Sequence, residues 1–183
     1  MQDKNDQVVA RLQKLEKFKE MGIEAYPHSF NRSHDSCLLK EKKEEFLANE
    51  TTISFAGRVV RFNRKGKVCF MHLKDRYGRL QVVCARDIVG EENYEVVKLI
   101  DLGDFIGVEG VMFETQTGEY SVKVSSVKML SKAVRPLPTQ KEKIDENGNK
   151  IIFNEFADVD TRYRQRYTDM ALNDDVKDVF IKR

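Results

Sequence analysis

The spacing of hydrophobic residues predicts helices at the start of the chain. Across residues 5–21 apolar side chains recur every three or four positions with Lys and Glu between them, which is typical of an amphipathic helix. We expect this helix to end just before Gly22, because glycine readily adopts the left-handed conformation that closes a helix. A second, shorter helix is expected at about 37–48, and Asp35 or Ser36 can cap its first amides.

From residue 52 the period of the apolar positions changes to two, which is typical of β-strands with one buried face. Five such runs are predicted, and they cover residues 52–60, 68–74, 79–85, 105–113 and 119–127. A basic turn at 64–67 and an Asp-first, Gly-last turn at 75–78 connect the first three runs, and a short helix at 91–100 follows them. This order predicts a β fold with flanking helices, namely the five-stranded OB-fold barrel. A two-layer sandwich is the alternative, but five strands are few for it.

The amino-acid composition changes after the fifth predicted strand. Two of the chain's three prolines lie there, and the polar stretch 139–150 includes Asn147-Gly148, which suits the tight turn of a small ribbon. Helical spacing resumes at 173–183 without a closing cap, so we expect a longer parent protein. Four parts are predicted: a helical extension at 1–50, an OB-fold domain at 51–132, a linker at 133–160 and the start of a further domain at 161–183.

The alternation within the strands places a set of polar and aromatic residues on the outer face of the barrel. Phe70, Gln81, Glu119 and Ser121 all fall on the side opposite the apolar positions of their strands. An exposed Phe can stack on a base, Gln81 can donate to and accept from a base edge, and Glu119 can accept from the ring N–H of uracil while repelling the acceptor of cytosine. The alternative is that Phe70 caps the barrel or packs under the N-terminal helix.

Positive charge is concentrated although the total is small. The 183 residues contain 32 Lys and Arg against 30 Asp and Glu, a net charge of +2. Between Arg58 and Arg79, however, eight cations face one acid, which gives +7 there and −5 for the rest. Aromatic residues interleave with these cations, as expected for a surface that binds single-stranded nucleic acid.

Several classes of protein are excluded by the same sequence. No apolar run is long enough for a membrane span, and the first residues lack the order of a signal peptide, so we expect a cytoplasmic protein without membrane contact. The three cysteines are widely spaced and no Cys-x-x-Cys pair exists, so neither a metal site nor a disulfide framework is expected. Nucleotide-binding and nucleophile motifs are missing, so we expect no catalytic residue and no bound cofactor in this chain.

Seven short segments, taken in order, carry a family resemblance. They are Tyr26-Pro27, Ala56-Gly57-Arg58, Gly66-Lys67, Asp101-Leu102-Gly103-Asp104, Thr117-Gly118-Glu119, Arg135-Pro136-Leu137-Pro138 and Arg162-Tyr163-Arg164-Gln165-Arg166-Tyr167. The ordered set resembles the N-terminal region of class II lysyl-tRNA synthetases over nearly the whole chain. Aspartyl- and asparaginyl-tRNA synthetases share the barrel but match the last two segments less well.

The resemblance implies that the chain binds the anticodon of lysine tRNA. The family's Phe, Gln and Glu that contact the central uracil fall on Phe70, Gln81 and Glu119, the positions that alternation places on one face. Many members carry Arg where this chain has Asn63, and Arg61 or Arg64 is expected to substitute for it. The predicted anticodon-binding residues are Phe70, Gln81, Glu119, Arg58, Arg61, Arg64, Lys67 and Arg79.

The resemblance also implies that the parent protein is a lysine–tRNA ligase. Such an enzyme activates lysine with ATP and Mg²⁺, esterifies the tRNA and forms a homodimer; residues 161–183 would open its catalytic domain. Two alternatives come from other classes. The chain could be a sequence-indifferent single-strand-binding protein, or a protein-interaction module whose N-terminal helix or helix after Asn173 docks a partner.

Overall fold

The computed structural model describes residues 2–138, 141–144, 150–153, 156 and 158–183. The chain divides into two compact units, one up to residue 136 and the other from residue 137 onward. The boundary lies within the segment 133–160 that was predicted to be a linker, and most of that segment belongs to the second unit.

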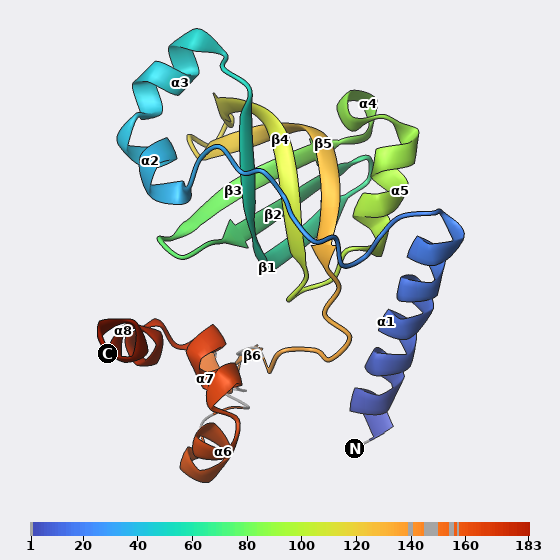
Figure 1. The fold of residues 1–183 in the computed structure, drawn as a ribbon, viewed down its shortest axis with the longest axis vertical. Helices are drawn as coiled ribbons and strands as arrows, with labels where there is room; N and C mark the ends of the chain where they lie inside the picture. The colour runs from blue at the N-terminus through green and yellow to red at the C-terminus, as the bar shows by residue number, and fades with distance from the viewer. Residues whose placement is uncertain (1, 139–140, 145–149, 154–155, 157) are drawn as a thin grey trace. The chain divides into compact units, whose positions relative to one another are not determined.

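The first unit is built around a closed five-stranded barrel (Figure 1). Its strands are β1 (Ile53–Lys65), β2 (Val68–Lys74), β3 (Arg79–Ala85), β4 (Phe105–Glu114) and β5 (Tyr120–Ser131). They follow the order β1-β2-β3-β5-β4, and antiparallel pairing of β1 with β4 closes the ring. The pairing of β3 with β5 is parallel, whereas the other pairs are antiparallel. This topology and the helix between β3 and β4 confirm the predicted OB-fold.

The barrel interior consists of the alternate apolar residues that the sequence pattern selected. Phe55, Met71 and Val82 are fully buried, and they come from three neighbouring strands. Close packing also demands a glycine in β4: a Cβ atom on Gly110 would lie 2.1 Å from the carbonyl oxygen of Lys123. A β-bulge begins between Glu109 and Gly110, where the two strands approach each other.

The first strand differs from its prediction in length and register. It continues to Lys65 instead of ending near residue 60, and only Gly66 and Lys67 form the turn into β2. Gly66 has a φ of 58°, which suits glycine at this tight turn. Within the strand a register shift between Val59 and Arg61 marks a bulge, and this bulge decides which later residues face outward.

The N-terminal helix is α1 (Gln2–Glu20), and it ends as the sequence predicts. Gly22 has a φ of 68°, and its N–H donates to the carbonyl oxygen of Lys19, while the N–H of Ile23 donates to that of Phe18. These two bonds form the Schellman arrangement that satisfies the last carbonyls of a helix. Phe18 is fully buried and holds this end of the helix in the core.

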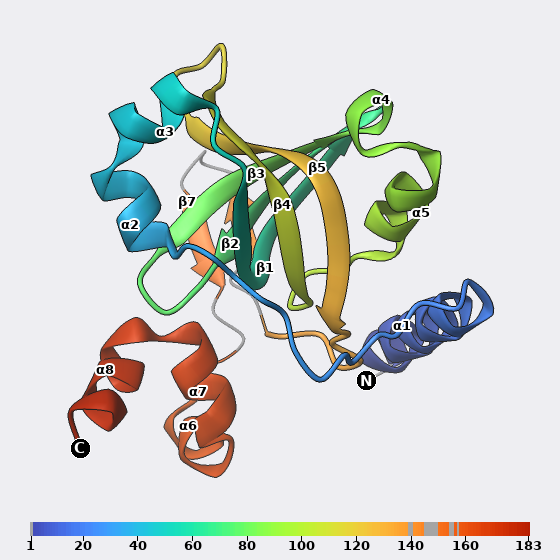
Figure 2. The ribbon, with the colours of Figure 1, turned by 45° about the horizontal axis from the view of Figure 1, so that its top comes forward.

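The second predicted helix is interrupted. It consists of α2 (Ser36–Glu41) and α3 (Lys43–Asn49), because the backbone at Lys42 leaves helical geometry with φ −102° and ψ 33°. Asp35 is the cap, and its carboxylate accepts from the N–H of Leu38. Figures 1 and 2 show both helices at the side of the barrel where β2 turns into β3.

On the other side of the barrel, two helices connect β3 to β4 (Figure 2). The predicted helix at 91–100 is α5 (Glu91–Leu99), and the single turn α4 (Arg86–Val89), which periodicity did not predict, precedes it. Gly90, with a φ of 81°, separates the two. No helix in the described ranges is both long and apolar enough to span a membrane.

The second unit contains a two-stranded ribbon and three short helices. The ribbon pairs β6 (Lys141–Ile144) with β7 (Lys150–Phe153), which confirms the predicted small ribbon, while the predicted Asn147-Gly148 turn lies outside the described residues. The helices are α6 (Val159–Arg164), α7 (Arg166–Leu172) and α8 (Asp174–Lys182). Only the last of them was predicted from helical spacing, because α6 and α7 are too short to show a period.

Candidate nucleic-acid interface

Phe70 lies on the outer face of the barrel between two strands. In the register of β2 it pairs with Asn63 of β1 and with Val83 of β3. It is half-buried and belongs neither to the hydrophobic core nor to the apolar residues that pack against it. Part of the Phe70 side chain is therefore accessible, as base stacking requires.

Next to Phe70 lies a hydrogen-bonded cluster of four side chains. His72 pairs with Gln81 across β2 and β3, and Gln81 lies opposite Ser121 in the parallel pairing of β3 with β5. The carboxylate of Glu119 accepts from Nε2 of Gln81 at 2.5 Å and lies 2.9 Å from Nε2 of His72. The hydroxyl of Ser121 donates to Oε1 of Gln81 at 2.8 Å.

This cluster fixes which way the amide of Gln81 points. A carboxylate can only accept hydrogen bonds, so the NH₂ group of Gln81 must face Glu119 and its oxygen must face Ser121. Among the described residues no side chain accepts the second hydrogen of that NH₂ group, so this hydrogen and the remaining lone pairs of Glu119 can bond to a ligand. The site thus presents a donor beside an acceptor.

The exposure of two cluster residues differs from the prediction. Gln81 and Ser121 were expected on an open outer face, but they are 8 % and 0 % exposed. The reason is the parallel pairing of β3 with β5, which lays the two side chains against each other under Glu119. Alternation within one strand predicts the side on which a residue lies, but it does not reveal what a neighbouring strand places over it.

The structure brings only some of the predicted cations to this face. Arg61 pairs with His72 and shares its side of the sheet, and Arg79 begins β3 two residues before Gln81. Arg64 pairs with the buried Cys69, so it lies on the opposite side of β1. Of the two candidates to substitute for the family arginine at Asn63, the register therefore favours Arg61.

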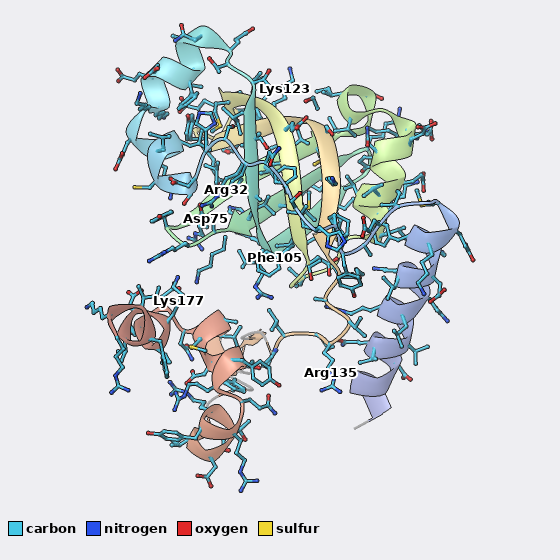
Figure 3. All side chains as sticks on the ribbon, viewed as in Figure 1. Arg32, Asp75, Phe105, Lys123, Arg135 and Lys177 are labelled. Carbon is cyan, nitrogen blue, oxygen red and sulfur yellow. The ribbon has the colours of Figure 1, made fainter. Side chains whose placement is uncertain are left out.

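The remaining two predicted cations occupy other places. The guanidinium of Arg58 lies 4.3 Å from the ring centre of Phe105 (labelled in Figure 3) and donates to the carbonyl oxygen of Gly103. Burial lowers the pKa of Arg58 below its ordinary value. Lys67 is exposed in the turn between β1 and β2.

A cavity of about 360 Å³ opens beside the cluster on the side of Arg79. The residues that line it are Lys40, Lys43, His72, Arg79, Leu80, Gln81, Glu119 and Tyr120. Its size falls in the range of small-molecule sites. Sequence reasoning missed Lys40 and Lys43, because α2 and α3 precede the barrel in the chain and only the tertiary fold brings them to its outer face.

Asp75 holds α2 in place beside this cavity. Its carboxylate accepts from the N–H and hydroxyl of Ser36, at 2.8 and 2.6 Å, and from the N–H groups of Tyr77 and Gly78. Figure 3 labels Asp75 near α2. Burial alone would raise the pKa of Asp75, but these hydrogen bonds to its charged form outweigh burial and hold the pKa below the ordinary value.

We expect Asp75→Asn to lower the free energy of unfolding at pH 7 by about 2 kcal/mol, because the variant no longer offers a charged acceptor to these donors. A lowered pKa means that the wild-type contribution is complete above the unfolded-state value near 3.9 and is lost as pH falls through the folded-state value. The difference between the two proteins should therefore shrink below about pH 4. Urea unfolding at pH 7 and pH 3 measures it, with the exposed Asp87→Asn as control. An equal deficit at both pH values would contradict the assignment.

Among the described residues, no group of three or more His, Cys, Asp or Glu side chains could hold a metal ion. The chemistry that the cluster and cavity offer is recognition by stacking, hydrogen bonding and positive charge.

Comparison with known proteins agrees with this geometry. Residues 53–130 match a family model described as an OB-fold nucleic acid binding domain. Over its whole length the chain is 41 % identical to a lysine–tRNA ligase of Staphylococcus epidermidis, and 40 % identical to lysine–tRNA ligases of Enterococcus faecalis and Streptococcus pneumoniae. The chain spans only 35 to 36 % of the length of these relatives. Residues 53–130 are thus similar to OB-fold nucleic acid binding domains, in a chain that is similar over its whole length to lysine–tRNA ligases.

Proposed function

We propose that this chain recognises the anticodon of lysine tRNA as part of a lysine–tRNA ligase. The observation that carries the proposal is the whole-chain similarity to lysine–tRNA ligases, together with the outward Phe70 beside the Gln81–Glu119 pair. In the parent protein a separate catalytic domain would activate lysine with ATP and Mg²⁺, and the parent would act as a cytoplasmic homodimer. This chain would supply binding and no catalytic group.

The donor and acceptor of the cluster suit uracil at the centre of the anticodon. Uracil carries a ring N–H next to a carbonyl oxygen, so Glu119 can accept from the N–H while Gln81 donates to the oxygen. Cytosine has a lone pair where uracil has the N–H, and the carboxylate would repel it. With the base stacked on Phe70, the site reads one base edge and one base face.

Replacing Phe70 by alanine tests the proposal. We expect Phe70→Ala to weaken binding of a lysine anticodon stem-loop roughly tenfold, because a base can no longer stack on the ring. Phe70→Tyr keeps the ring and should bind like wild type, while thermal melting confirms that both variants fold. Fluorescence anisotropy with a labelled stem-loop gives the affinities.

Two results would contradict the proposal. Equal affinity of Phe70→Ala and wild type would show that no base stacks on Phe70. Equal binding of oligo-dT and the stem-loop, with no effect of changing the central uridine to cytidine, would identify a sequence-indifferent single-strand-binding protein instead.

A further inference from the structure

The cavity beside the Gln81–Glu119 pair carries three cations on its walls. Lys40 comes from α2, Lys43 from α3 and Arg79 from the first position of β3. Lys40 and Arg79 form no ion pair with any residue that the structure describes, and Lys43 lies 3.5 Å from Glu114. Three cations at one opening outnumber the carboxylates of Glu119, which lines the cavity, and Glu114, which pairs with Lys43, and this excess of positive charge attracts an anion.

The lysines are held in position by the fold. Leu39 and Phe46, one on each helix, are buried in the core, so the segment that carries both lysines is fixed to the barrel. The ammonium of Lys40 lies against the β2–β3 turn, since a Cβ atom on Gly78 would be 3.4 Å from it. The ammonium of Lys43 lies 5.5 Å from the ring centre of Tyr120.

The cations and the base-reading groups share this cavity. Gln81 and Glu119 line it together with the two lysines, so a nucleotide whose base lies against that pair has its backbone within reach of the cationic wall. Phosphate is the anion that such a strand brings, and lysine binds it as a point charge.

We propose that the cavity binds phosphate of the RNA strand, so that the α2–α3 segment is part of the RNA-binding surface. This segment precedes the matched OB-fold domain at 53–130, and the inference rests on the proposed function. Phosphate binding contributes affinity and salt dependence but no sequence information. Lys40 and Lys43 therefore have an effect distinct from that of Gln81 and Glu119.

The double variant Lys40→Ala/Lys43→Ala tests the inference. Binding of the lysine anticodon stem-loop, measured by anisotropy between low and high salt, should weaken roughly five- to tenfold at low salt. The slope of log affinity against log salt should fall by about 0.7 for each phosphate that the variant no longer neutralises. The preference for a central uridine over cytidine should stay unchanged.

Two control variants distinguish the effect of where a lysine lies from the effect of its charge. Lys42→Ala removes an exposed lysine that pairs with Glu45 at 3.2 Å and does not line the cavity, so it should bind like wild type. Lys40→Arg/Lys43→Arg keeps the charge and should retain the affinity and salt slope. Thermal melting confirms that each variant folds.

The possible results distinguish this inference from the proposed function. If the double alanine variant matches Lys42→Ala in affinity and slope while wild type still prefers a central uridine, the phosphate site is refuted and the proposed function stands. If wild type shows no preference for uridine, the proposed function fails, whereas a reduced salt slope in the double variant would still support a phosphate site.

Discussion

Lys132→Met is expected to lower the free energy of unfolding by about 3–5 kcal/mol, the cost of leaving one member of a buried ion pair without its partner. The ammonium of Lys132 is fully buried and donates to the carboxylates of Asp104 and Asp101, at 2.7 and 2.6 Å, and to the carbonyl oxygen of Leu99 at 2.9 Å. Methionine would fill similar space but would leave the fully buried Asp104 without a cation.

The same cluster joins α1 to the end of the barrel. The ammonium of Lys14 lies 2.5 Å from Asp101, and the guanidinium of Arg11 donates to the carbonyl oxygens of Ala133 and Leu102. Asp104 also accepts from the N–H of Ala133 at 2.8 Å. Removal of Lys132 should therefore loosen α1 as well, and amide hydrogen exchange in α1 should increase.

Urea unfolding of Lys132→Met and of a matched control gives the size of the effect. Lys128→Met removes an exposed lysine from β5, the strand that ends just before Lys132, and should change stability by less than about 0.5 kcal/mol. Burial raises the pKa of Asp104 despite the opposing charge of Lys132, and removing that charge raises it further. A raised pKa means that the folded state takes up protons, so the deficit of Lys132→Met should shrink as pH falls from 7 to 5. A deficit similar to that of Lys128→Met would show that the pair contributes no stability.

The barrel was predictable from the sequence because its signal is local. Alternation in β2 predicts that Met71 faces inward and Phe70 outward without knowledge of any other strand. The turn at 75–78 is likewise predicted from four consecutive residues, Asp first and Gly last. The break at Lys42 and the helical turn α4 could not be predicted in this way, because each involves too few residues to change the spacing of apolar positions.

The candidate site was predictable only in part because its decisive features are tertiary. The register shift after Val59 puts Arg61 rather than Arg64 on the side of the sheet where Phe70 lies. No residue type in the sequence indicates this shift. Gln81 and Ser121 bury each other through a parallel pairing between strands that are far apart in the sequence. The sequence therefore identifies the residues that we propose to read a base, but the cavity beside them emerges only from the fold.

Glu119→Gln is expected to remove most of the discrimination between uridine and cytidine at the centre of the anticodon. A good two-bond contact to a base edge is worth about 1–3 kcal/mol of discrimination, so wild type should prefer uridine by roughly ten- to a hundredfold. The carboxylate would produce this preference in two ways: it would repel the ring acceptor of cytosine, and it holds the NH₂ group of Gln81 on the side of Glu119, where that group could donate to uracil.

A glutamine at position 119 ends both effects. Its amide can present either its oxygen or its NH₂ group, and the amide of Gln81 becomes free to turn over because its neighbour can now donate as well as accept. Ser121 does not prevent this, since a hydroxyl can accept from an NH₂ group as readily as it donates to an oxygen. Cytidine should therefore bind better and uridine worse, which brings the ratio of affinities within about threefold.

The ratio is the measurement that isolates this effect. Stem-loops that differ only in the central base are compared on wild type, Glu119→Gln and Glu109→Gln, the last of which changes an exposed carboxylate of β4 that does not line the cavity. Glu109→Gln should keep the wild-type ratio. Lower affinity of Glu119→Gln for both bases at an unchanged ratio would mean that Glu119 supports the site without reading the base.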